Sequence, residues 1–121
     1  MGTSYSFGQA AEQVVATYLQ SRGGKILTRR WLCKVGEIDL IADLGGELHF
    51  VEVKGRSGKN WDSGGLEAVG ITKQRKLCRA AQVFLQAHPE YQSAACHFDV
   101  ALVCKKPLQL QLYLEDAFGC L

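Results

Sequence analysis

Apolar residues recur at helical spacing in two segments of the chain. In residues 6–22 they cover one side of a helix and stop at Gly23–Gly24, a pair that is typical of a helix end. At about 100° per residue, Glu12 falls about 20° beyond the edge of this apolar arc, so it can reach from the packed side toward a cleft. A second helix is predicted over residues 73–87, with Thr72 as its N-cap and a proline beyond its end.

The remaining segments predict strands and their connections. Residues 36–54 contain two apolar runs around Gly45–Gly46, which is the pattern of a hairpin with a two-residue turn. The other segments are, in chain order, a short edge strand at 26–28, a turn at 29–36, a loop at 55–66, a buried strand at 97–104, an alternating strand at 108–114 and a tail with a helical turn at 115–121. This order predicts an α/β domain with a mixed sheet.

Four charged residues interrupt the apolar strands of the predicted hairpin. If Gly45–Gly46 is the turn, Asp39 faces Glu52 and Glu37 faces Lys54. Side chains alternate across a strand, so all four are expected on one face of the sheet. The opposite face is then the core side, made of Ile38, Leu40, Ala42, Val51 and Val53.

Two facing carboxylates are costly unless another group compensates them. At about 5 Å they repel by roughly 3 kcal/mol at an effective dielectric of about 20. The repulsion is relieved if one carboxyl is protonated, if Lys54 or another cation neutralises the pair, or if a metal ion lies between them. A solvated ladder of surface salt bridges is the purely structural alternative. Hard oxygen ligands favour Mg²⁺, with Mn²⁺ as a substitute.

The order of Asp39, then Glu52 and Lys54 about a dozen residues later, suits phosphodiester hydrolysis. Two carboxylates can hold a divalent metal against a phosphate, where the metal polarises the phosphoryl oxygen and lowers the pKa of bound water. Lys54 lies two residues after Glu52 and on the same face, so it can stabilise charge that builds on phosphorus. The pattern is weak alone and gains specificity from its place on a hairpin flanked by helices.

Composition narrows the setting. With 121 residues, 47% of them hydrophobic and 21% charged, the chain is expected to form one domain, residues 1–121, with a real core. No apolar run reaches the ~20 residues of a membrane span, and the N-terminus has no signal-peptide pattern. A cytoplasmic protein is therefore expected. The five cysteines lack the spacing of metal ligands and are expected to be reduced thiols.

The net charge of +2 hides an uneven distribution. Residues 22–79 hold twelve Lys or Arg and seven Asp or Glu, a net charge of +5, while the flanking parts hold two basic and five acidic residues, a net charge of −3. A basic middle is compatible with a phosphate-rich partner. A solvated surface of mixed charge would give the same counts.

Several segments resemble one protein family. They are "FGQAAEQVVATYLQSRGGKIL", "GEIDLIA", "FVEVKGR" and "AVGITKQRKLCRAAQVFL…HFDVALV". Over about residues 7–118 the chain is similar to the YraN-type family, whose members are regarded as endonucleases and are similar to archaeal Holliday-junction resolvases of the PD-(D/E)xK nuclease superfamily. The resemblance implies a restriction-endonuclease-like α/β domain, with a mixed central sheet flanked by helices, and Mg²⁺-dependent deoxyribonuclease activity.

The resemblance also implies roles for individual residues. Asp39 and Glu52 match the metal ligands, Lys54 matches the catalytic lysine, and Glu12 matches the helix glutamate of the resolvase-like branch. The chain departs from the family pattern at His97, where an arginine is common.

Contacts to DNA are expected from basic and polar residues that follow the hairpin. These candidates are Arg56, Lys59, Lys73, Gln74, Arg75, Lys76 and Arg79. Trp61 can stack on an unpaired base, or it can simply hold its loop in place. The likeness to resolvases suggests branched DNA and a homodimer, because a four-way junction presents two symmetric cleavage points. The apolar residues at 108–114 and Phe118 suit either such an interface or ordinary core packing.

Two other classes of function remain compatible with the sequence. A non-catalytic nucleic-acid-binding module could retain the nuclease fold, although it would need none of Asp39, Glu52 and Lys54. A structural partner protein could use the hairpin charges only as salt bridges. Metal titration separates both classes from the enzyme.

Overall fold

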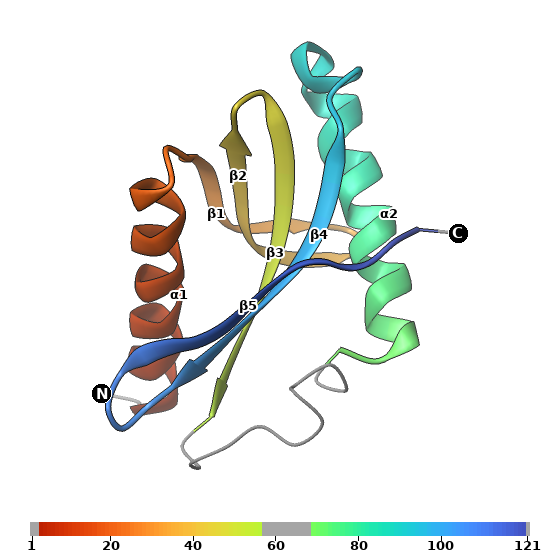
Figure 1. Ribbon diagram of the computed structural model, residues 1–121. Coiled ribbons are helices and arrows are strands. Elements are labelled where there is room, and N and C mark those ends of the chain that lie inside the picture. The colour runs from red at the N-terminus through yellow and green to blue at the C-terminus, as the bar shows by residue number, and fades with distance from the viewer. Residues whose placement is uncertain (1–2, 57–68, 121) are drawn as a thin grey trace.

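The strands of the molecule build a mixed sheet with a helix on each face (Figure 1). The computed structural model describes residues 3–56 and 69–120. In chain order the elements are α1 (Thr3–Ser21), β1 (Lys25–Cys33), β2 (Gly36–Leu44), β3 (Glu47–Arg56), α2 (Ile71–Ala87), the 3-10 helix η2 (Pro89–Tyr91), β4 (Cys96–Cys104) and β5 (Gln109–Phe118). This confirms the predicted order of helix, three strands, helix and two strands, and the α/β class. The predicted loop at 55–66 lies mostly outside the described residues.

The order of the strands in the sheet follows their order in the chain, from β1 to β5. Neighbouring strands are antiparallel, except that β3 and β4 are parallel, because the chain returns through α2 between them. β1 and β5 are therefore the two edges of the sheet. No helix in the described part of the chain is long and apolar enough to cross a membrane.

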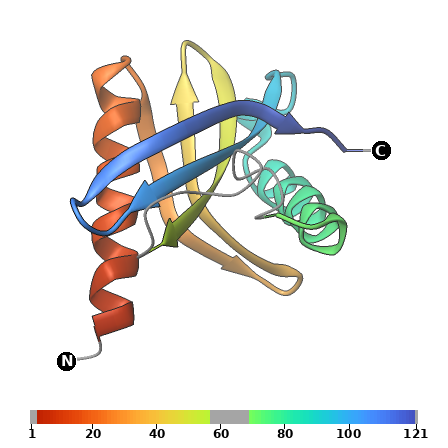
Figure 2. The same ribbon diagram turned by 60° about the horizontal axis from the view of Figure 1, so that its bottom comes forward.

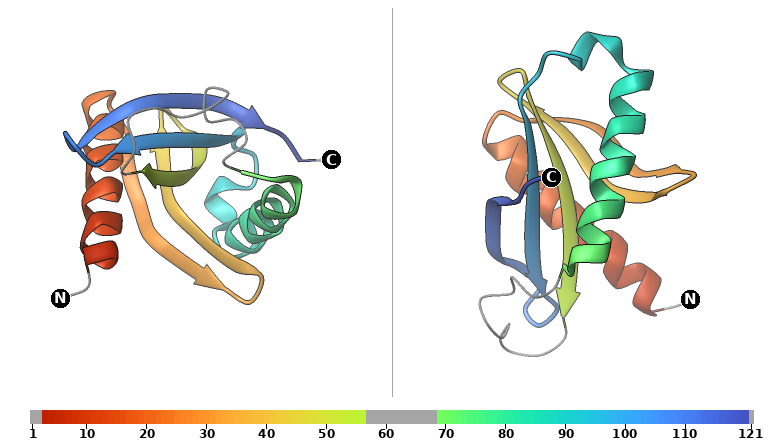
Figure 3. Two further views of the ribbon diagram at one scale, coloured as in Figure 1. Left: turned by 90° about the horizontal axis from the view of Figure 1, so that it is seen from below. Right: turned by 90° about the vertical axis from the view of Figure 1, so that its right-hand side faces the viewer.

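Both faces of the sheet are buried, each under one helix (Figure 3). The core on the α1 face consists of Ala11, Val15, Ala16, Leu19, Leu40, Ala42, Val51, Ala101 and Val103. The core on the α2 face consists of Ile38, Ile41, Leu48, Phe50, Val69, Leu77, Ala80, Ala81, Phe84, Phe98, Val100 and Leu102. The central strands therefore carry apolar residues on both sides, as is usual for strands covered by helices.

β1 is much longer than the predicted edge strand, and the predicted turn at 29–36 is mostly strand. The turn itself is limited to residues 34–35. The ring of Trp31 meets the ring of Phe84 in α2 edge-to-face, with centroids 5.5 Å apart. Extension of the strand thus buries this ring against α2, a long-range contact that outweighs the polar character of the segment.

Two other boundaries differ from the prediction. α2 begins at Ile71 with Gly70 as its N-cap and no side-chain cap, so Thr72 lies inside the first turn. The tail after residue 114 contains no helical turn, because β5 continues to Phe118. The ring of Phe118 stacks on the ring of Phe98 in β4 at 5.3 Å, so pairing with β4 keeps this part of the tail extended.

The β1–β2 hairpin bends away from the rest of the sheet and passes beside α2 (Figure 2). Arg30 lies at the bend with a φ of 51°, a left-handed conformation that is uncommon for a residue with a side chain. The Gly45–Gly46 turn forms as predicted, and both glycines have positive φ. Pairing of β2 with β3 runs outward from Leu44–Glu47 to Leu40–Val51, where it ends.

The predicted hairpin register therefore holds only near the turn. Beyond Leu40 the two strands separate, so Asp39 does not pair with Glu52, and Glu37 pairs with β1 instead of facing a lysine on β3. Ile38 belongs to the core under α2, whereas Leu40 belongs to the core under α1. The prediction of one core face is wrong at Ile38, because the bend rotates this end of β2.

One disulfide connects Cys78 of α2 with Cys120. The expectation of reduced thiols is therefore wrong for these two cysteines, and it is met by Cys33, Cys96 and Cys104, which are free. The bonded pair is 42 residues apart in the chain, so no short spacing in the sequence could reveal it.

Phe84 should contribute strongly to stability because its ring, 1% exposed, packs between Trp31 and Phe50. We expect Phe84→Ala to lower the free energy of unfolding by about 3–5 kcal/mol, measured by urea denaturation. The adjacent Val83 is 38% exposed, so Val83→Ala should change this free energy by less than about 0.5 kcal/mol. Equal effects of the two substitutions would contradict the packing described here.

Candidate active site

Asp39 lies at the point where β2 separates from β3. Its Oδ2 accepts a hydrogen bond of 2.8 Å from the Val53 N–H. A side chain of β2 thus satisfies a backbone donor of β3 that lies beyond the end of the β2–β3 ladder. The bend of the hairpin at Arg30 is what opens the space for this carboxyl group between the strands.

Glu52 is the most deeply buried carboxylate of this region, with a side chain only 4% exposed. Its Oε2 lies 3.3 Å from Nζ of Lys54 and 3.6 Å from Nζ of Lys73, which comes from the first turn of α2. Its Oε1 is buried and has no hydrogen-bond partner among the described residues. Burial of a polar atom without a partner is costly, so this oxygen is a candidate ligand atom.

Asp39 and Glu52 act on each other electrostatically although their strands have separated. The pKa of Asp39 is raised to about 7, chiefly by burial and then by the charge of Glu52 and a hydrogen bond between the two carboxyl groups, while the hydrogen bond from the Val53 N–H lowers it. No lysine or arginine forms an ion pair with Asp39 in the part of the chain that the structure describes. The lysines of this site therefore lie beside Glu52, at its Oε2, and not beside Asp39.

Glu12 reaches the same region from α1. Its side chain is 14% exposed, and its Oε1 accepts a hydrogen bond of 2.9 Å from Nε of Arg30. Glu12, Asp39 and Val53 line one small cavity of about 150 Å³, together with Phe7, Gly8, Ala11 and Gly55. The negative charge of Glu12 also contributes to the raised pKa of Asp39.

Gly55 forms a wall of this cavity, and its lack of a side chain is needed there. A Cβ atom at this position would lie 2.6 Å from Cε2 of Phe7, closer than real Cβ contacts. Phe7 can therefore pack flat over β3 and place the first part of α1 against the site.

The structure brings together the predicted residues Glu12, Asp39, Glu52 and Lys54 from three elements, and it adds Arg30 and Lys73. Sequence analysis did not identify Arg30 as part of the site, because only the bend of β1 places it beside α1. Lys73, which is predicted to contact phosphate, lies with its Nζ 3.6 Å from Oε2 of the buried Glu52. Glu37, two residues before Asp39 in β2, is exposed, pairs with Leu32 of β1 and does not line the cavity of Glu12 and Asp39.

The predicted DNA contacts lie mainly on α2. Gln74, Arg75 and Arg79 line a surface groove of about 670 Å³ between α2 and residues 119–120. Lys76 is exposed on the same helix. Arg56 ends β3. Lys59 and Trp61 lie outside the described residues.

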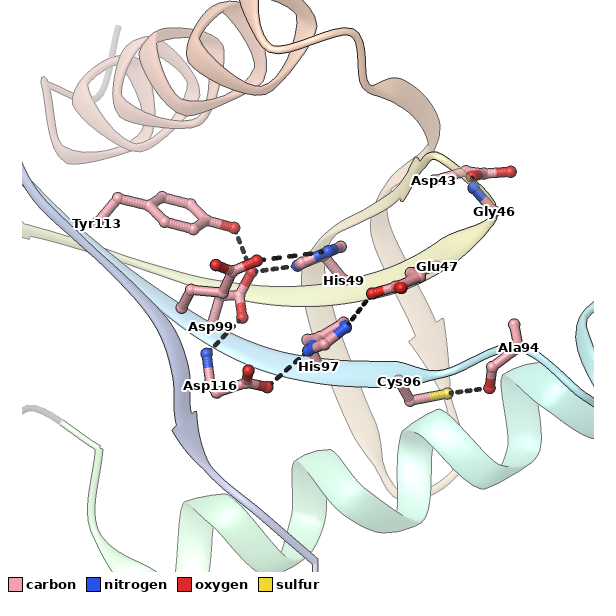
Figure 4. Close-up of polar contacts among 11 residues, drawn as sticks. Asp43, Gly46, Glu47, His49, Ala94, Cys96, His97, Asp99, Tyr113 and Asp116 are labelled. Carbon is pink, nitrogen blue, oxygen red and sulfur yellow. Dashed lines mark hydrogen bonds and ion pairs between the residues drawn. The ribbon is translucent and has the colours of Figure 1, made fainter.

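A second polar group, which the sequence did not indicate, lies near the Gly45–Gly46 turn (Figure 4). Glu47, His49 and His97 each present a ligand atom, and these atoms all lie within 4.8 Å of one another. His49 lies beside His97 because β3 and β4 pair in parallel, so the group could be expected only once these two strands are known to be neighbours.

The donor atoms of Asp39 and Glu52 fit a hard divalent cation. Both are carboxylates, one has a buried oxygen without a partner, and the other has no cationic partner among the described residues. Mg²⁺ binds through one or two carboxylates and retains several waters, so it does not require a closed set of protein ligands. The two carboxylates could hold such an ion, and Glu12 could contact its waters across the shared cavity.

Comparisons with known proteins match most of the chain to one protein family. The model of the uncharacterised protein family UPF0102 matches residues 11–103. A UPF0102 protein of Gloeobacter violaceus is 51% identical over 98% of this chain and 96% of its own length. A UPF0102 protein of Stutzerimonas stutzeri is 42% identical over 85% of both chains.

One solved structure overlaps the fold weakly. SfsA of Pyrococcus furiosus, in complex with Ca²⁺, covers 92% of this chain and 64% of its own, with a TM-score of 0.43 and 12% identity. An overlap this weak carries no argument about function.

The raised pKa of Asp39 predicts how stability depends on pH without metal. Between about pH 4 and about pH 7 the folded protein keeps a proton that the unfolded chain has released, so stability falls as pH rises through this window. Each unit of pKa difference is worth about 1.4 kcal/mol. Asp39→Asn keeps an acceptor for the Val53 N–H but cannot ionise. In EDTA it should therefore stabilise the protein at pH 8 by a few kcal/mol at most and have little effect at pH 4.

Thermal denaturation of both proteins across this pH range measures the difference. Glu37→Gln is the matched control, because Glu37 is an exposed carboxylate of the same strand and should not produce this pH dependence. A constant difference between wild type and Asp39→Asn at all pH values would contradict the assignment.

Proposed function

The chain belongs to the uncharacterised protein family UPF0102, the YraN-type family that its motifs resemble, and we propose that it is a metal-dependent nuclease that hydrolyses phosphodiester bonds in DNA. The observation that carries the proposal is the buried, partnerless Oε1 of Glu52 close to the uncompensated carboxyl group of Asp39. Burying these two carboxyl groups close together is costly, and a divalent cation between them would offset the cost.

Asp39 and Glu52 would hold the metal ion, with Mg²⁺ as the natural ion and Mn²⁺ as a substitute. When bound, the ion would supply a polarised phosphate and a water of lowered pKa. Lys54 lies 3.3 Å from Oε2 of Glu52, so its ammonium group is held next to the metal ligands, where negative charge develops on phosphorus. Lys73 is positioned similarly from α2 and can help to bind the phosphate.

Glu12 would act by orienting water and by keeping Arg30 in place. Its hydrogen bond to Nε of Arg30 fixes the carboxylate at the wall of the cavity that it shares with Asp39. It lies on α1 rather than on the sheet, so the site depends on the packing of this helix.

The exposed basic face of α2 offers a path for DNA. Arg75 and Arg79 line the groove beside α2. Lys73, in the first turn of the same helix, lies next to Glu52. Guanidinium groups bind phosphates in two-point contacts, so Arg75 and Arg79 could hold a DNA backbone along α2. Because Lys73 of the same helix lies beside Glu52, this DNA backbone would pass close to the carboxylates. Arg56, Lys59, Gln74 and Lys76 belong to the same proposal.

A branched substrate and a homodimer are further parts of the proposal. The likeness to resolvases suggests a junction, and paired incision of a junction needs two copies of a single-site chain. β5 is an edge strand on which Leu112 is 38% exposed, and Leu108, just before the strand, is 44% exposed. Pairing of this edge with a second copy would cover them.

Metal binding tests the carboxylate pair directly. Calorimetry with Mg²⁺ should detect binding to the wild type, and Asp39→Ala or Glu52→Ala should weaken it at least tenfold, because each removes one of two proposed ligands. Glu37→Ala should bind Mg²⁺ like the wild type, since this carboxylate is exposed and its backbone pairs with β1 rather than with β3. Unchanged Mg²⁺ affinity in both ligand variants would refute the site.

Lys54 should matter for cleavage more than for metal binding. We expect Lys54→Ala to retain Mg²⁺ affinity and to lose about 10²-fold or more of the cleavage rate, because its charge acts on the phosphate in the transition state. The control Lys25→Ala removes an exposed charge of β1 and should cleave normally. Assays on four-way junctions and linear duplex would also show whether branched DNA is preferred. A Lys54→Ala protein that cleaves at the wild-type rate would exclude this role.

A further inference from the structure

His49 and His97 stand side by side at one end of the sheet (Figure 4). They are paired in the parallel register of β3 and β4, and their rings stack with centroids 4.4 Å apart and an interplanar angle of 17°. They lie on the α1 side of the sheet, since Ala42, the cross-strand partner of His49, belongs to the core under α1. Glu52 follows three residues after His49 and points to the opposite face, toward Lys73 of α2.

Asp99 holds the ring of His49 in a defined orientation. Its Oδ2 lies 2.6 Å from Nδ1 of His49 and also accepts a hydrogen bond from the Tyr113 hydroxyl. Its Oδ1 accepts a bond of 3.0 Å from the backbone N–H of Asp116. Asp99 is only 1% exposed, and these hydrogen bonds fix the position of its carboxylate. A carboxylate at Nδ1 makes that nitrogen the donor and leaves Nε2 of His49 as the nitrogen that can bind a metal.

His97 repeats the same arrangement with different partners. Its Nδ1 lies 2.7 Å from Oδ1 of Asp116, and its Nε2 lies 2.6 Å from Oε1 of Glu47. On the other ring, Nε2 of His49 lies 3.8 Å from Oε2 of Glu115. Each imidazole therefore has a carboxylate on its Nδ1 and a second carboxylate close to its Nε2.

A bulge in β5 supplies two of these carboxylates. β4 pairs Phe98 with Phe118 and Val100 with Leu114, so three residues of β5 stand opposite the single residue Asp99. Within the bulge, Asp116 has a φ of 54°, which is uncommon and unfavourable for a residue with a side chain. Bulges of this kind redirect side chains and are frequent beside functional sites. Here the bulge places Glu115 and Asp116 beside the histidines.

The group has too little positive charge for its carboxylates. Asp99 and Glu115 form ion pairs with His49, and Glu47 and Asp116 form ion pairs with His97. Within residues 3–56 and 69–120, these four carboxylates form ion pairs with the two histidines alone. Two protonated rings would leave a net charge of −2, and one divalent cation bound to two neutral rings would leave the same charge, so such an ion can take the place of the two protons.

We propose that Glu47, His49 and His97 bind a divalent transition metal such as Zn²⁺, with Glu115 as the fourth ligand. The two imidazole nitrogens favour Zn²⁺ over Mg²⁺, and Zn²⁺ also accepts carboxylate oxygen. The outer carboxylates Asp99 and Asp116 match the usual second partner of a metal-binding histidine. The site is separate from the proposed nuclease centre. The proposed metal ligands of that centre are the carboxylates Asp39 and Glu52, and Glu52 points to the face of the sheet opposite the histidines.

The distances are compatible with this ion. Zn²⁺ bonds of about 2.0–2.2 Å in a tetrahedron require ligand atoms roughly 3.4 Å apart. The ligand atoms of Glu47, His49 and His97 all lie within 4.8 Å of one another, and the shortest separation, between His97 and Glu47, is 2.6 Å. Because an imidazole binds a metal in the plane of its ring, the two stacked rings would tilt until both nitrogens point to one position. Glu47 and Glu115 have side chains 54% and 47% exposed, so both are free to rotate toward this position.

The bound ion would connect three strands. Glu47 and His49 belong to β3, His97 belongs to β4, and Glu115 belongs to the bulge of the edge strand β5. Binding would therefore hold β5 against the central strands and stabilise the folded protein in proportion to metal affinity. The competing explanation is that His97 merely bridges Glu47 and Asp116 as a charged imidazolium, without metal.

The substitution His97→Arg separates the two explanations. Arginine can donate to Glu47 and Asp116 but cannot ligate a metal ion. Metal-free wild type and His97→Arg are titrated with Zn²⁺ by calorimetry, and their melting temperatures are measured with and without Zn²⁺. We expect the wild type to bind one Zn²⁺ with a rise in melting temperature, and His97→Arg to fold and bind at least 100-fold more weakly. Glu47→Gln changes an exposed ligand and should weaken binding at least tenfold.

Controls exclude other binding positions. Cys96→Ser and Glu52→Gln should retain the Zn²⁺ affinity of the wild type, because Cys96 and the proposed nuclease centre are outside the site. Binding of Co²⁺ in place of Zn²⁺ should give a visible spectrum of nitrogen and oxygen ligation without thiolate charge transfer. The proposal is overturned if His97→Arg binds Zn²⁺ like the wild type, or if Cys96→Ser or Glu52→Gln abolishes binding. The Zn²⁺ titration does not depend on the nuclease proposal, because Mg²⁺ binding and cleavage are measured with variants of Asp39, Glu52 and Lys54.

Discussion

The structure around the candidate site depends on two carboxyl groups, those of Asp39 and Glu52, that are buried close together. They lie where the ladder of hydrogen bonds between β2 and β3 has ended. Asp39 and Glu52 cannot both be charged without a cost, and the raised pKa of Asp39 expresses that cost. The surrounding elements provide partial compensation. Lys54 and Lys73 neutralise one oxygen of Glu52, and the Val53 N–H donates to Asp39. The other oxygen of Glu52 remains without a partner in the described chain, and this remaining deficit is what a divalent cation would remove.

The bend of the β1–β2 hairpin makes this arrangement possible. A regular ladder would satisfy the Val53 N–H with backbone and would leave the two carboxylates on one exposed face. At the bend, Arg30 adopts a left-handed conformation, and its side chain pairs with Glu12 of α1. The same bend turns the end of the hairpin toward α2, where Trp31 contacts Phe84. Packing on both helices therefore stabilises the irregular backbone that opens the site.

The two faces of the central strands carry different chemistry. On the α2 side, Glu52 lies near lysines and suits a hard cation and a phosphate. On the α1 side, His49 and His97 lie among carboxylates and suit a softer cation. Both arrangements arise from interruptions of the ladder, one at the bend of β2 and the other at the bulge of β5. Regular strands supply rigidity, and the irregular positions direct polar side chains.

The sequence by itself determined the order of the elements, the Gly45–Gly46 turn and the family, because periodicity, turn chemistry and motifs are local properties of the chain. It also singled out Glu12, Asp39, Glu52 and Lys54 as a candidate group. Only the tertiary structure decided how far the hairpin register extends, since the bend depends on contacts with two distant helices. It likewise decided the extent of β5, the Cys78–Cys120 bond and the pairing of His49 with His97. In each case the partners lie tens of residues apart, and their contact is favourable only after the sheet has brought them together.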